Sequence, residues 1–298
     1  MQQLAVISGK GGTGKTSVVA CFAALAGEKV LVDCDVDAAD LHLVLSPTIL
    51  ETHEFRSGHV ARIREEDCRF CGECMESCRF DAIGPVGDGF CYQVDPIACE
   101  GCRVCVEFCP AQAIDFEERT CGEWFISETS HGPMVHARLG IAAENSGKLV
   151  TTIRQAGHEI AENQGRSLLL IDGPPGIGCP VIASITGTDF VLVVAEPTLS
   201  SLHDFDRVIS LTAHFRIPTA VCVNKWDLNP EITRRIEQAA RSRNVSIAGR
   251  VRYDPAVTQA QVKRLSTVEY GGQAADDIRK VWERIRARTT GLVQIDSH

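Results

Sequence analysis

The 298-residue sequence has no run of about 18 apolar residues, the length that a membrane-spanning helix needs. Its start lacks the basic segment and apolar stretch of a secretory signal, since Met1 leads almost directly into the short apolar run at residues 4–7. No basic stripe of the kind that binds nucleic acid is visible. We therefore expect a cytoplasmic protein with no stable membrane anchor that does not bind nucleic acid.

Lysine is absent from residues 58–118, which hold five Arg against thirteen Asp and Glu and so carry −8 of the chain's formal charge of −9. The same segment holds nine of the fourteen cysteines. Cytosolic thiols stay reduced, so clustered cysteines indicate metal binding rather than disulfides. We predict that an acidic, cysteine-rich module is inserted into a protein of another kind.

Outside this segment, short apolar runs alternate with helical stretches such as residues 16–26 and 273–288. Strands that are apolar on both faces are typical of a parallel sheet covered by helices on both sides. The expected strands are residues 4–8, 30–32, 168–171, 190–195 and 219–223. The pattern resumes only after about residue 145, and 119–147 is left unassigned. We predict an α/β domain, residues 1–57 and 119–298, interrupted by a small inserted α+β domain at 58–118.

A glycine-rich loop of the form G-x-x-x-x-G-K-[ST] lies between the first expected strand and the first expected helix. Its glycines let backbone N–H groups turn toward phosphates, and the helix N-terminus adds partial positive charge. Lys15 can reach the β- and γ-phosphates, and the Thr16 hydroxyl can hold Mg²⁺. The predicted nucleotide-binding residues here are Gly11, Gly12, Thr13, Gly14, Lys15, Thr16 and Ser17.

With Lys10 included, the loop resembles the deviant Walker A motif of the MinD/ParA-type P-loop ATPases. In that family the additional lysine, here Lys10, reaches the nucleotide of the partner subunit. The resemblance therefore implies an ATP-dependent dimer, formed by two copies of the chain or with a paralogue. It also implies an Mg²⁺-dependent ATPase built on a mostly parallel P-loop NTPase sheet.

Two further motifs carry the resemblance. In Val32-Asp33-Cys34-Asp35 the second aspartate, Asp35, corresponds to the residue that orients or activates the attacking water, although Asp33 and Asp37 lie close by in sequence. Residues 169–176 (LLIDGPPG) look like the Walker B strand and the switch after it, in which Asp172 holds Mg²⁺ through water. The implied catalytic residues are Lys10, Lys15, Asp35 and Asp172.

Asn224-Lys225-Trp226-Asp227 follows the expected strand at residues 219–223. The side chains of Asn224 and Asp227 suit the edge of a purine base. A pattern of this kind also reads guanine in GTPases, so it does not choose between ATP and GTP, whereas the family resemblance favours ATP. Residues 253–255 are a further candidate wall of the base pocket.

The cysteine spacing C-x₂-C-x₂-C-x₃-C occurs twice, from Cys68 and again from Cys99, and is the run of bacterial ferredoxins. Three closely spaced thiolates hold one cluster and the fourth holds the other. Zinc in two Cys₄ sites is the alternative, but it does not call for this duplicated spacing. Arg79 stands after Cys78 where ferredoxins usually have Pro, so we expect an altered turn there. The predicted 4Fe–4S ligands are Cys68, Cys71, Cys74 and Cys109 for one cluster, and Cys99, Cys102, Cys105 and Cys78 for the other.

Nearly the whole chain thus resembles MinD-superfamily P-loop ATPases with an inserted ferredoxin domain, including residues 136–139 and 144–150. Cys179, seven residues after Asp172, resembles a cysteine of the nitrogenase iron protein that holds a cluster shared across its dimer. The alternative is a buried structural thiol. A bridging cluster needs a second cysteine, for which Cys121 is the candidate.

The function that this implies is nucleotide-gated electron transfer to or from a redox protein partner, with ATP, Mg²⁺ and two 4Fe–4S clusters as cofactors. One alternative is an iron–sulfur cluster carrier or assembly ATPase. Related carriers hold their cluster on a C-x-x-C motif in the ATPase domain, and the absence of such a motif outside residues 68–109 argues against this alternative. Another is a positioning ATPase like MinD with the clusters as sensors. MinD binds the membrane through an amphipathic C-terminal helix, whereas residues 284–298 of this chain show no continuous apolar face.

Overall fold

The structure is a computed structural model that describes residues 1–87, 91–140 and 145–292. The chain forms two compact units. The first consists of Met1–His53, Glu123–Leu139 and the residues from Ser146 onward, and the second of Glu54–Gly122 with Gly140 and Asn145. Glu144 and residues 293–298, which entered the argument above, lie outside the described residues.

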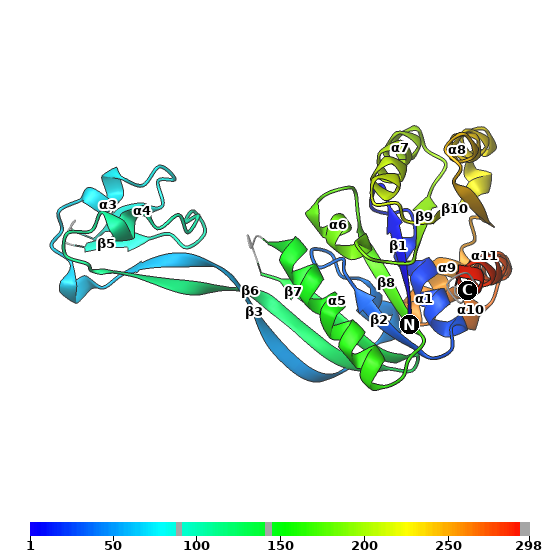
Figure 1. Cartoon of the computed structure of the whole chain (residues 1–298), viewed down its shortest axis with the longest axis horizontal. Helices are drawn as coiled ribbons and strands as arrows, with labels where there is room; N and C mark the ends of the chain where they lie inside the picture. Colours follow the sequence, from blue (N-terminus) through cyan, green and yellow to red (C-terminus); the bar gives the residue numbers. More distant parts are fainter. Residues whose placement is uncertain (88–90, 141–144, 293–298) are drawn as a thin grey trace, which may run out of the picture. The chain divides into compact units, whose positions relative to one another are not determined.

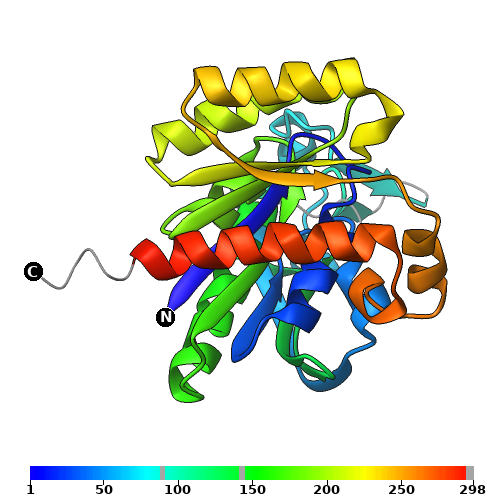
Figure 2. The same cartoon turned by 90° about the vertical axis from the view of Figure 1, so that its right-hand side faces the viewer.

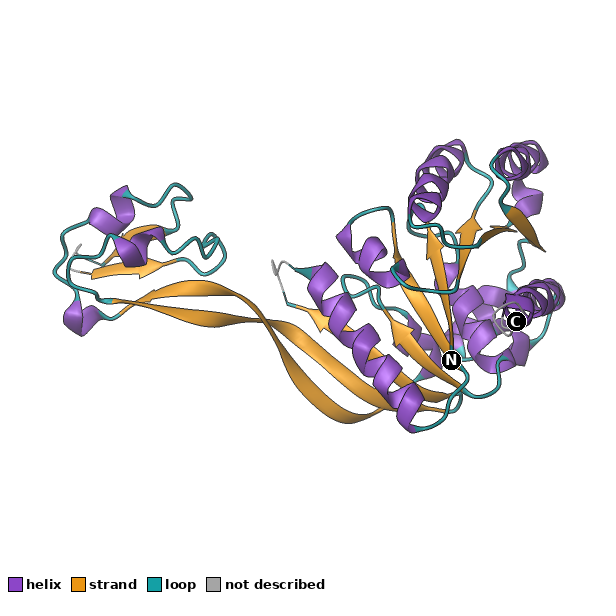
Figure 3. Cartoon of the chain, viewed as in Figure 1, coloured by secondary structure: helices purple, strands orange, loops and turns teal. Residues whose placement is uncertain are grey.

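The division falls a few residues outside the expected 58–118 because two long strands carry the chain between the units (Figure 3). β3 (Thr48–Ile63) leads into the second unit, and β6 (Ile114–Thr129) leads back. Each strand has 16 residues, so the boundaries after His53 and after Gly122 fall inside β3 and β6.

A nine-stranded sheet forms the centre of the first unit (Figure 1). Neighbouring strands pair in parallel from β11 through to β7. Five of the strands were expected from their apolar runs, and the mostly parallel α/β fold is confirmed. The strands in sheet order are β11 (Ser246–Val251), β10 (Thr219–Asn224), β9 (Phe190–Ala195), β1 (Gln2–Ser8), β8 (Leu168–Pro175), β2 (Lys29–Asp33), β7 (Gly132–Leu139), β6 and β3.

The expectation that the sheet resumes only after residue 145 was wrong. β7 pairs in parallel with β2, and β6 is its next neighbour. The reason lies in the sequence of these strands. The buried stretch of β7 includes His136, and the first half of β6 carries charged side chains, so neither strand reads as a continuous apolar run.

Helices cover both faces of the sheet (Figures 1 and 2). On one face α1 (Lys15–Leu25) packs with α2 (Leu41–Leu45), α10 (Thr267–Tyr270) and α11 (Gln273–Leu292), and α10 packs with α9 (Ala256–Val262). On the other lie α5 (Ser146–Asn163), α6 (Cys179–Ile185), α7 (Leu199–His214) and α8 (Pro230–Ser242), the last preceded by the short turn η2 (Trp226–Leu228).

The core between α1, α11 and the sheet holds large apolar side chains. The Phe22 and Trp282 rings lie 4.9 Å apart, and Ala274, Ile278, Val281 and Ile285 are buried as the helical pattern predicted. Each fully buried large side chain contributes roughly 1.5–3 kcal/mol, so this face anchors the helix that carries the phosphate loop.

The second unit is small. It contains η1 (Glu65–Asp67), α3 (Glu73–Glu76), the antiparallel pair β4 (Ile83–Val86) and β5 (Cys91–Val94), and α4 (Val104–Glu107). Its core consists of Ala61, Ile83, Val94 and Ile114 together with two of the spaced cysteines, Cys74 and Cys105. Among the helices that the structure describes, none combines the length and the apolar character needed to cross a membrane.

Candidate functional site

The glycine-rich loop joins β1 to α1 at the carboxyl edge of the sheet. Gly12 and Gly14 have φ of 79° and 84°, which side chains rarely adopt. A Cβ on Gly14 would lie 2.3 Å from Nδ2 of Asn224, so this position also lacks space for a side chain. The expected binding residues, Gly11 to Ser17, all line one large pocket.

Lys15 is buried in this pocket, with Nζ 2.5 Å from Oδ1 of Asp172 and 3.7 Å from Oδ2 of Asp35. Burial alone would lower the pKa of Lys15, but the charge and hydrogen bond of Asp172 outweigh it and the pKa is raised. Oδ2 of Asp172 and Oγ1 of Thr13 are buried and bond to no described residue. These unpaired atoms fit a magnesium–nucleotide, which would draw Lys15 to phosphate and leave Asp172 and Thr16 for Mg²⁺.

The three neighbouring aspartates after β2 have different surroundings. Asp33 is fully buried and accepts the backbone N–H groups of Asp35 (3.1 Å) and Leu41 (3.3 Å), so it shapes the loop. Asp37 is exposed and does not line the pocket. Asp35 does line it. Burial raises the pKa of Asp35 to about 6, with Lys15 opposing and Asp172 adding to the shift. Position therefore favours Asp35 for contact with a bound nucleotide or its water.

Because its pKa is raised, the ionised Asp35 carboxylate destabilises the nucleotide-free fold. The cost is absent below the ordinary pKa of 3.8, grows as the pH rises, and is complete above about pH 6. We expect Asp35→Asn to raise the free energy of unfolding at pH 8 by roughly 1–2 kcal/mol, a value reduced for partial solvent screening. The gain should fade between pH 6 and pH 4.

Urea unfolding followed by tryptophan fluorescence measures this effect selectively, since Trp124, Trp226 and Trp282 all belong to the first unit. The matched control is Asp37→Asn, which removes an exposed carboxylate from the same loop and should give a much smaller pH-dependent difference, since the charge of Asp37 adds less than burial to the Asp35 shift. A stability gain that is equal for both variants, or absent for Asp35→Asn, would contradict the assignment.

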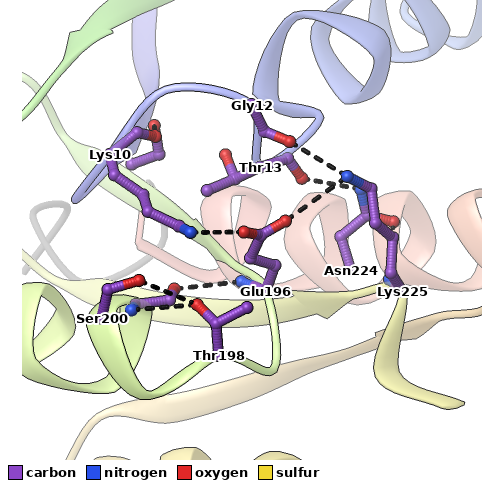
Figure 4. Close-up of polar contacts among 10 residues, drawn as sticks. Lys10, Gly12, Thr13, Glu196, Thr198, Ser200, Asn224 and Lys225 are labelled. Atoms are coloured by element: carbon purple, nitrogen blue, oxygen red, sulfur yellow. Dashed lines mark hydrogen bonds and ion pairs between the residues drawn. The ribbon is translucent and has the colours of Figure 1, made fainter. Parts of the chain in front are cut away.

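Lys10 is held by a glutamate that the sequence did not single out. Its Nζ lies 2.5 Å from Oε1 of Glu196, directly after β9 (Figure 4). Lys225 Nζ approaches Oε2 of the same carboxylate at 3.4 Å and donates to the Gly12 carbonyl at 3.0 Å. A polar residue at the carboxyl end of a parallel strand was the available signal for Glu196.

Next to Lys225, Asn224 Nδ2 donates to the Thr13 carbonyl at 2.7 Å and so braces the phosphate loop (Figure 4). Asp227 does not line the pocket, because its Oδ1 accepts the Tyr253 backbone N–H at 2.7 Å. Tyr253 and Asp254 do line it. Further lining side chains that the sequence did not indicate are Leu43, Val44, Arg252, Val257, Thr258, Gln261 and Val262.

The eight spaced cysteines divide between two pockets of the second unit. Cys68, Cys71, Cys74 and Cys109 line one, and Cys78, Cys99, Cys102 and Cys105 line the other. This is the crossed division that the spacing predicts. Among the described residues, no group of three or more His, Cys, Asp or Glu is arranged to hold a metal ion. Four thiols around an apolar-walled pocket are nevertheless the donor set of a 4Fe–4S cluster.

Cys179 and Cys121 lie in different units. Cys179 is exposed at the first residue of α6. Cys121 is buried, and its thiol donates to the Ser57 carbonyl at 3.0 Å. The buried structural role that was the alternative for Cys179 therefore applies to Cys121 instead.

A series of contacts connects the loop after β2, which carries Asp35, with strands β7 and β6. Leu41, bonded to Asp33, begins α2, and the next residue, His42, stacks on His136 of β7 with ring centroids 6.0 Å apart. Nε2 of His136 lies 2.9 Å from Oγ of Ser127 on β6. Burial lowers the pKa of His136 to about 4, with His42 adding to the effect, so the ring is neutral at pH 7.

Comparison with known proteins agrees with this geometry. A protein of Methanocaldococcus jannaschii, the uncharacterized protein MJ0578, is 34% identical over 233 residues, which cover 77% of this chain and 80% of that protein. The indolepyruvate oxidoreductase subunit IorA of Methanothermobacter marburgensis is 40% identical over 57 residues, 19% of this chain and 9% of that protein.

The septum site-determining protein MinD of Pyrococcus horikoshii, solved in complex with Mg-ADP, has the same fold. It superposes with a TM-score of 0.58 at 16% identity and covers 95% of each chain. Residues 4–268 match the CobQ/CobB/MinD/ParA nucleotide binding domain. The protein therefore belongs to the CobQ/CobB/MinD/ParA family of nucleotide-binding domains.

Proposed function

We propose that this protein binds and hydrolyses ATP and uses the nucleotide state to gate electron transfer to or from a redox protein. One observation carries the proposal. Two pockets, each lined by four cysteines, lie in a unit that is covalently continuous through β3 and β6 with a nucleotide-binding unit. A chain that needed the clusters only as structural staples would not have to join them to a phosphate loop.

ATP is the nucleotide that the pocket favours. Recognition of guanine by an Asn-Lys-x-Asp motif requires the carboxylate to face the base, and Asp227 does not line the pocket while its Oδ1 accepts the Tyr253 backbone N–H. Lys15 and the backbone of the loop hold the phosphates, Thr16 and Asp172 hold Mg²⁺, and Asp35 orients the attacking water. The raised pKa of Asp35 suits a carboxylate that takes part in proton transfer near neutral pH.

The cysteine pockets would hold two 4Fe–4S clusters, which supply one-electron redox chemistry when bound. The chain's own residues determine the surroundings. Cys74 and Cys105 are buried in the small core, where Ile83, Val94 and Ile114 exclude water. The short match to a protein named as an oxidoreductase subunit is in keeping with a redox role.

Coupling between nucleotide and redox sites would start at the loop after β2. Besides the contacts of His42 and His136, the Leu139 N–H donates to the Val36 carbonyl at 3.2 Å, which ties the end of β7 to this loop. The loop runs through α2 into β3, which enters the second unit. A nucleotide that moved Asp35 would thus bias segments that continue into the cysteine-rich unit.

The test is an anaerobic redox titration with and without a non-hydrolysable ATP analogue. A coupling of 1–3 kcal/mol corresponds to a shift of about 40–130 mV in midpoint potential for a one-electron couple. We expect such a shift, or a matching change in electron-transfer rate, in the wild type. Neither should occur in Lys15→Gln, which keeps a polar, slightly shorter side chain but loses the cation that holds phosphate.

Identical potentials and rates with and without the analogue would contradict gating. Release of clusters to an apo-ferredoxin on addition of ATP would instead establish the cluster-carrier alternative. Burial of Cys74 and Cys105 counts against it, since a cargo cluster needs ligands that exchange readily.

A further inference from the structure

The two cysteine motifs can be compared position by position, because they share one spacing. At two positions next to the ligands, one motif has a phenylalanine and the other a small residue. Where the first motif has Phe70, the second has Gly101. Where the second motif has Phe108, the first has Ser77. Both phenylalanines are therefore neighbours of ligands of one pocket, since Phe70 precedes Cys71 and Phe108 precedes Cys109.

The Gly101 side is covered by the chain itself. A Cβ on Gly101 would lie 2.4 Å from the His59 carbonyl oxygen of β3, so a side chain like that of Phe70 has no space there. The His59 ring stacks on Phe116 at 4.7 Å, and the Arg103 guanidinium lies over the same ring at 5.9 Å. Strand β3 therefore covers the backbone at Gly101, beside the second pocket, although Glu100, Cys102 and Arg103 of the same loop stay exposed.

The first pocket differs in that a phenylalanine precedes two of its ligands, whereas the exposed apolar side chain beside the second pocket is the smaller Val104, at 37%. Phe70 is 42% exposed and Phe108 62% exposed, although burying a Phe side chain is worth roughly 1.5–3 kcal/mol. Met75, one residue after the ligand Cys74, is also exposed, at 38%. Exposed apolar side chains grouped around one site indicate an interaction surface, whereas scattered ones do not.

Charge follows the same division. The 14 residues 65–78 hold five acidic side chains and one Arg, a net of −4, whereas residues 96–109 hold two acidic side chains and one Arg, a net of −1. Glu66, Glu73 and Glu76 are all exposed. An apolar centre with an acidic surround matches a partner that has an apolar centre and a basic rim.

We propose that the first-motif face, formed by Phe70, Phe108, Glu66, Glu73 and Glu76, is the docking surface for a basic redox protein. This inference rests on the proposed electron-transfer function and selects which of its two sites meets the partner. One electron passes at this face, so that the donor is oxidised and the acceptor reduced by one equivalent, with no bond made or broken. The second site exchanges electrons with the first and does not meet the partner.

The test uses cytochrome c, a basic one-electron acceptor, with the full chain purified anaerobically. Binding of the oxidised proteins is measured by calorimetry at low salt. We expect Phe70→Ser/Phe108→Ser to weaken binding at least tenfold, and Phe70→Tyr/Phe108→Tyr to restore most of it. The matched control is Ile97→Ser/Val86→Ser, which removes two exposed apolar side chains elsewhere in the same unit and should leave the affinity within twofold.

The charge arm compares two pairs of exposed glutamates. Glu73→Gln/Glu76→Gln should weaken binding and flatten its salt dependence, whereas Glu117→Gln/Glu118→Gln on β6 should change neither. If the Ile97/Val86 pair weakens binding as much as the phenylalanine pair, or if the phenylalanine pair has no effect, the first-motif face is not the docking surface.

Electron transfer is followed separately, by mixing dithionite-reduced protein with ferricytochrome c after iron analysis of each variant. A rate that falls only in the phenylalanine and Glu73/Glu76 variants supports the proposal. Equal rates in all variants overturn the docking face and leave the proposed function intact. Binding that depends on the phenylalanines without any electron transfer supports the surface and overturns the proposed function.

Discussion

Replacing Lys10 by alanine is expected to abolish ATP-dependent association and nearly all hydrolysis, while a single chain still binds ATP with near wild-type affinity. Lys15 already occupies the position from which a cation reaches the phosphates of its own chain. Lys10 is directed to Glu196 instead. Its ammonium becomes useful to a nucleotide only when a second subunit closes over the pocket and brings a γ-phosphate within reach. Sedimentation with a non-hydrolysable ATP analogue measures the effect.

The matched control is Glu196→Gln, which breaks the same ion pair but keeps the lysine. A partly exposed pair of this kind contributes about 0.2–1 kcal/mol, so its loss should leave association intact or strengthen it up to about fivefold. If Lys10→Ala still associates with the analogue and hydrolyses ATP at the wild-type rate, the lysine does not act across a dimer. If both variants lose ATP-dependent association equally, association depends on the Lys10–Glu196 ion pair and not on Lys10 reaching the nucleotide of a second subunit.

Single substitutions at the last cysteine of each motif are expected to remove one cluster each, and not the one nearest in sequence. Cys109→Ser should reduce iron from about eight to about four atoms per chain and spare the site of Cys99, Cys102 and Cys105. Cys78→Ser should do the reverse. Iron and acid-labile sulfide analysis after anaerobic purification gives the stoichiometry, and electron paramagnetic resonance distinguishes the remaining centres.

Double variants separate the crossed from the uncrossed division. Cys71 and Cys109 line the same pocket, so Cys71→Ser/Cys109→Ser should still retain about four iron atoms, whereas Cys102→Ser/Cys109→Ser should lose both clusters. An uncrossed assignment exchanges these two results. Cys91→Ser is the control, since Cys91 lies between the motifs but lines neither pocket, and it should keep all eight. Stable zinc with no iron would exclude the iron–sulfur assignment altogether.

Features fixed by short-range spacing could be predicted from the sequence. The phosphate loop needs glycine at positive φ beside a strand, and the division of the cysteines follows from their separation along the chain. What could not be predicted depends on distant segments meeting. Glu196 reaches Lys10 only because β9 and β1 are neighbours in the sheet, and Gly101 is special only because the His59 carbonyl lies against it.

Similar reasoning explains why the sequence did not predict that β6 and β7 belong to the sheet. β6 and β3 form one end of the sheet, where one face of a strand can stay polar, and in the buried β7 the polar His136 interrupts the apolar run. Asp227 is a further case. The motif predicted a base contact, but an Asp carboxylate can equally accept a backbone N–H, and the loop at Tyr253 supplies one.

The strands that lead into and out of the second unit, β3 and β6, lie side by side where they leave the first unit. β3 and β6 are neighbours at the end of the sheet, and the rings of His53 and Trp124, one on each strand, stack with centroids 4.0 Å apart. A two-residue turn could therefore join the chain there in place of residues 54–122 without interrupting any strand in the sheet interior. The second unit is therefore an insertion between two neighbouring strands at the end of the sheet of the nucleotide-binding unit.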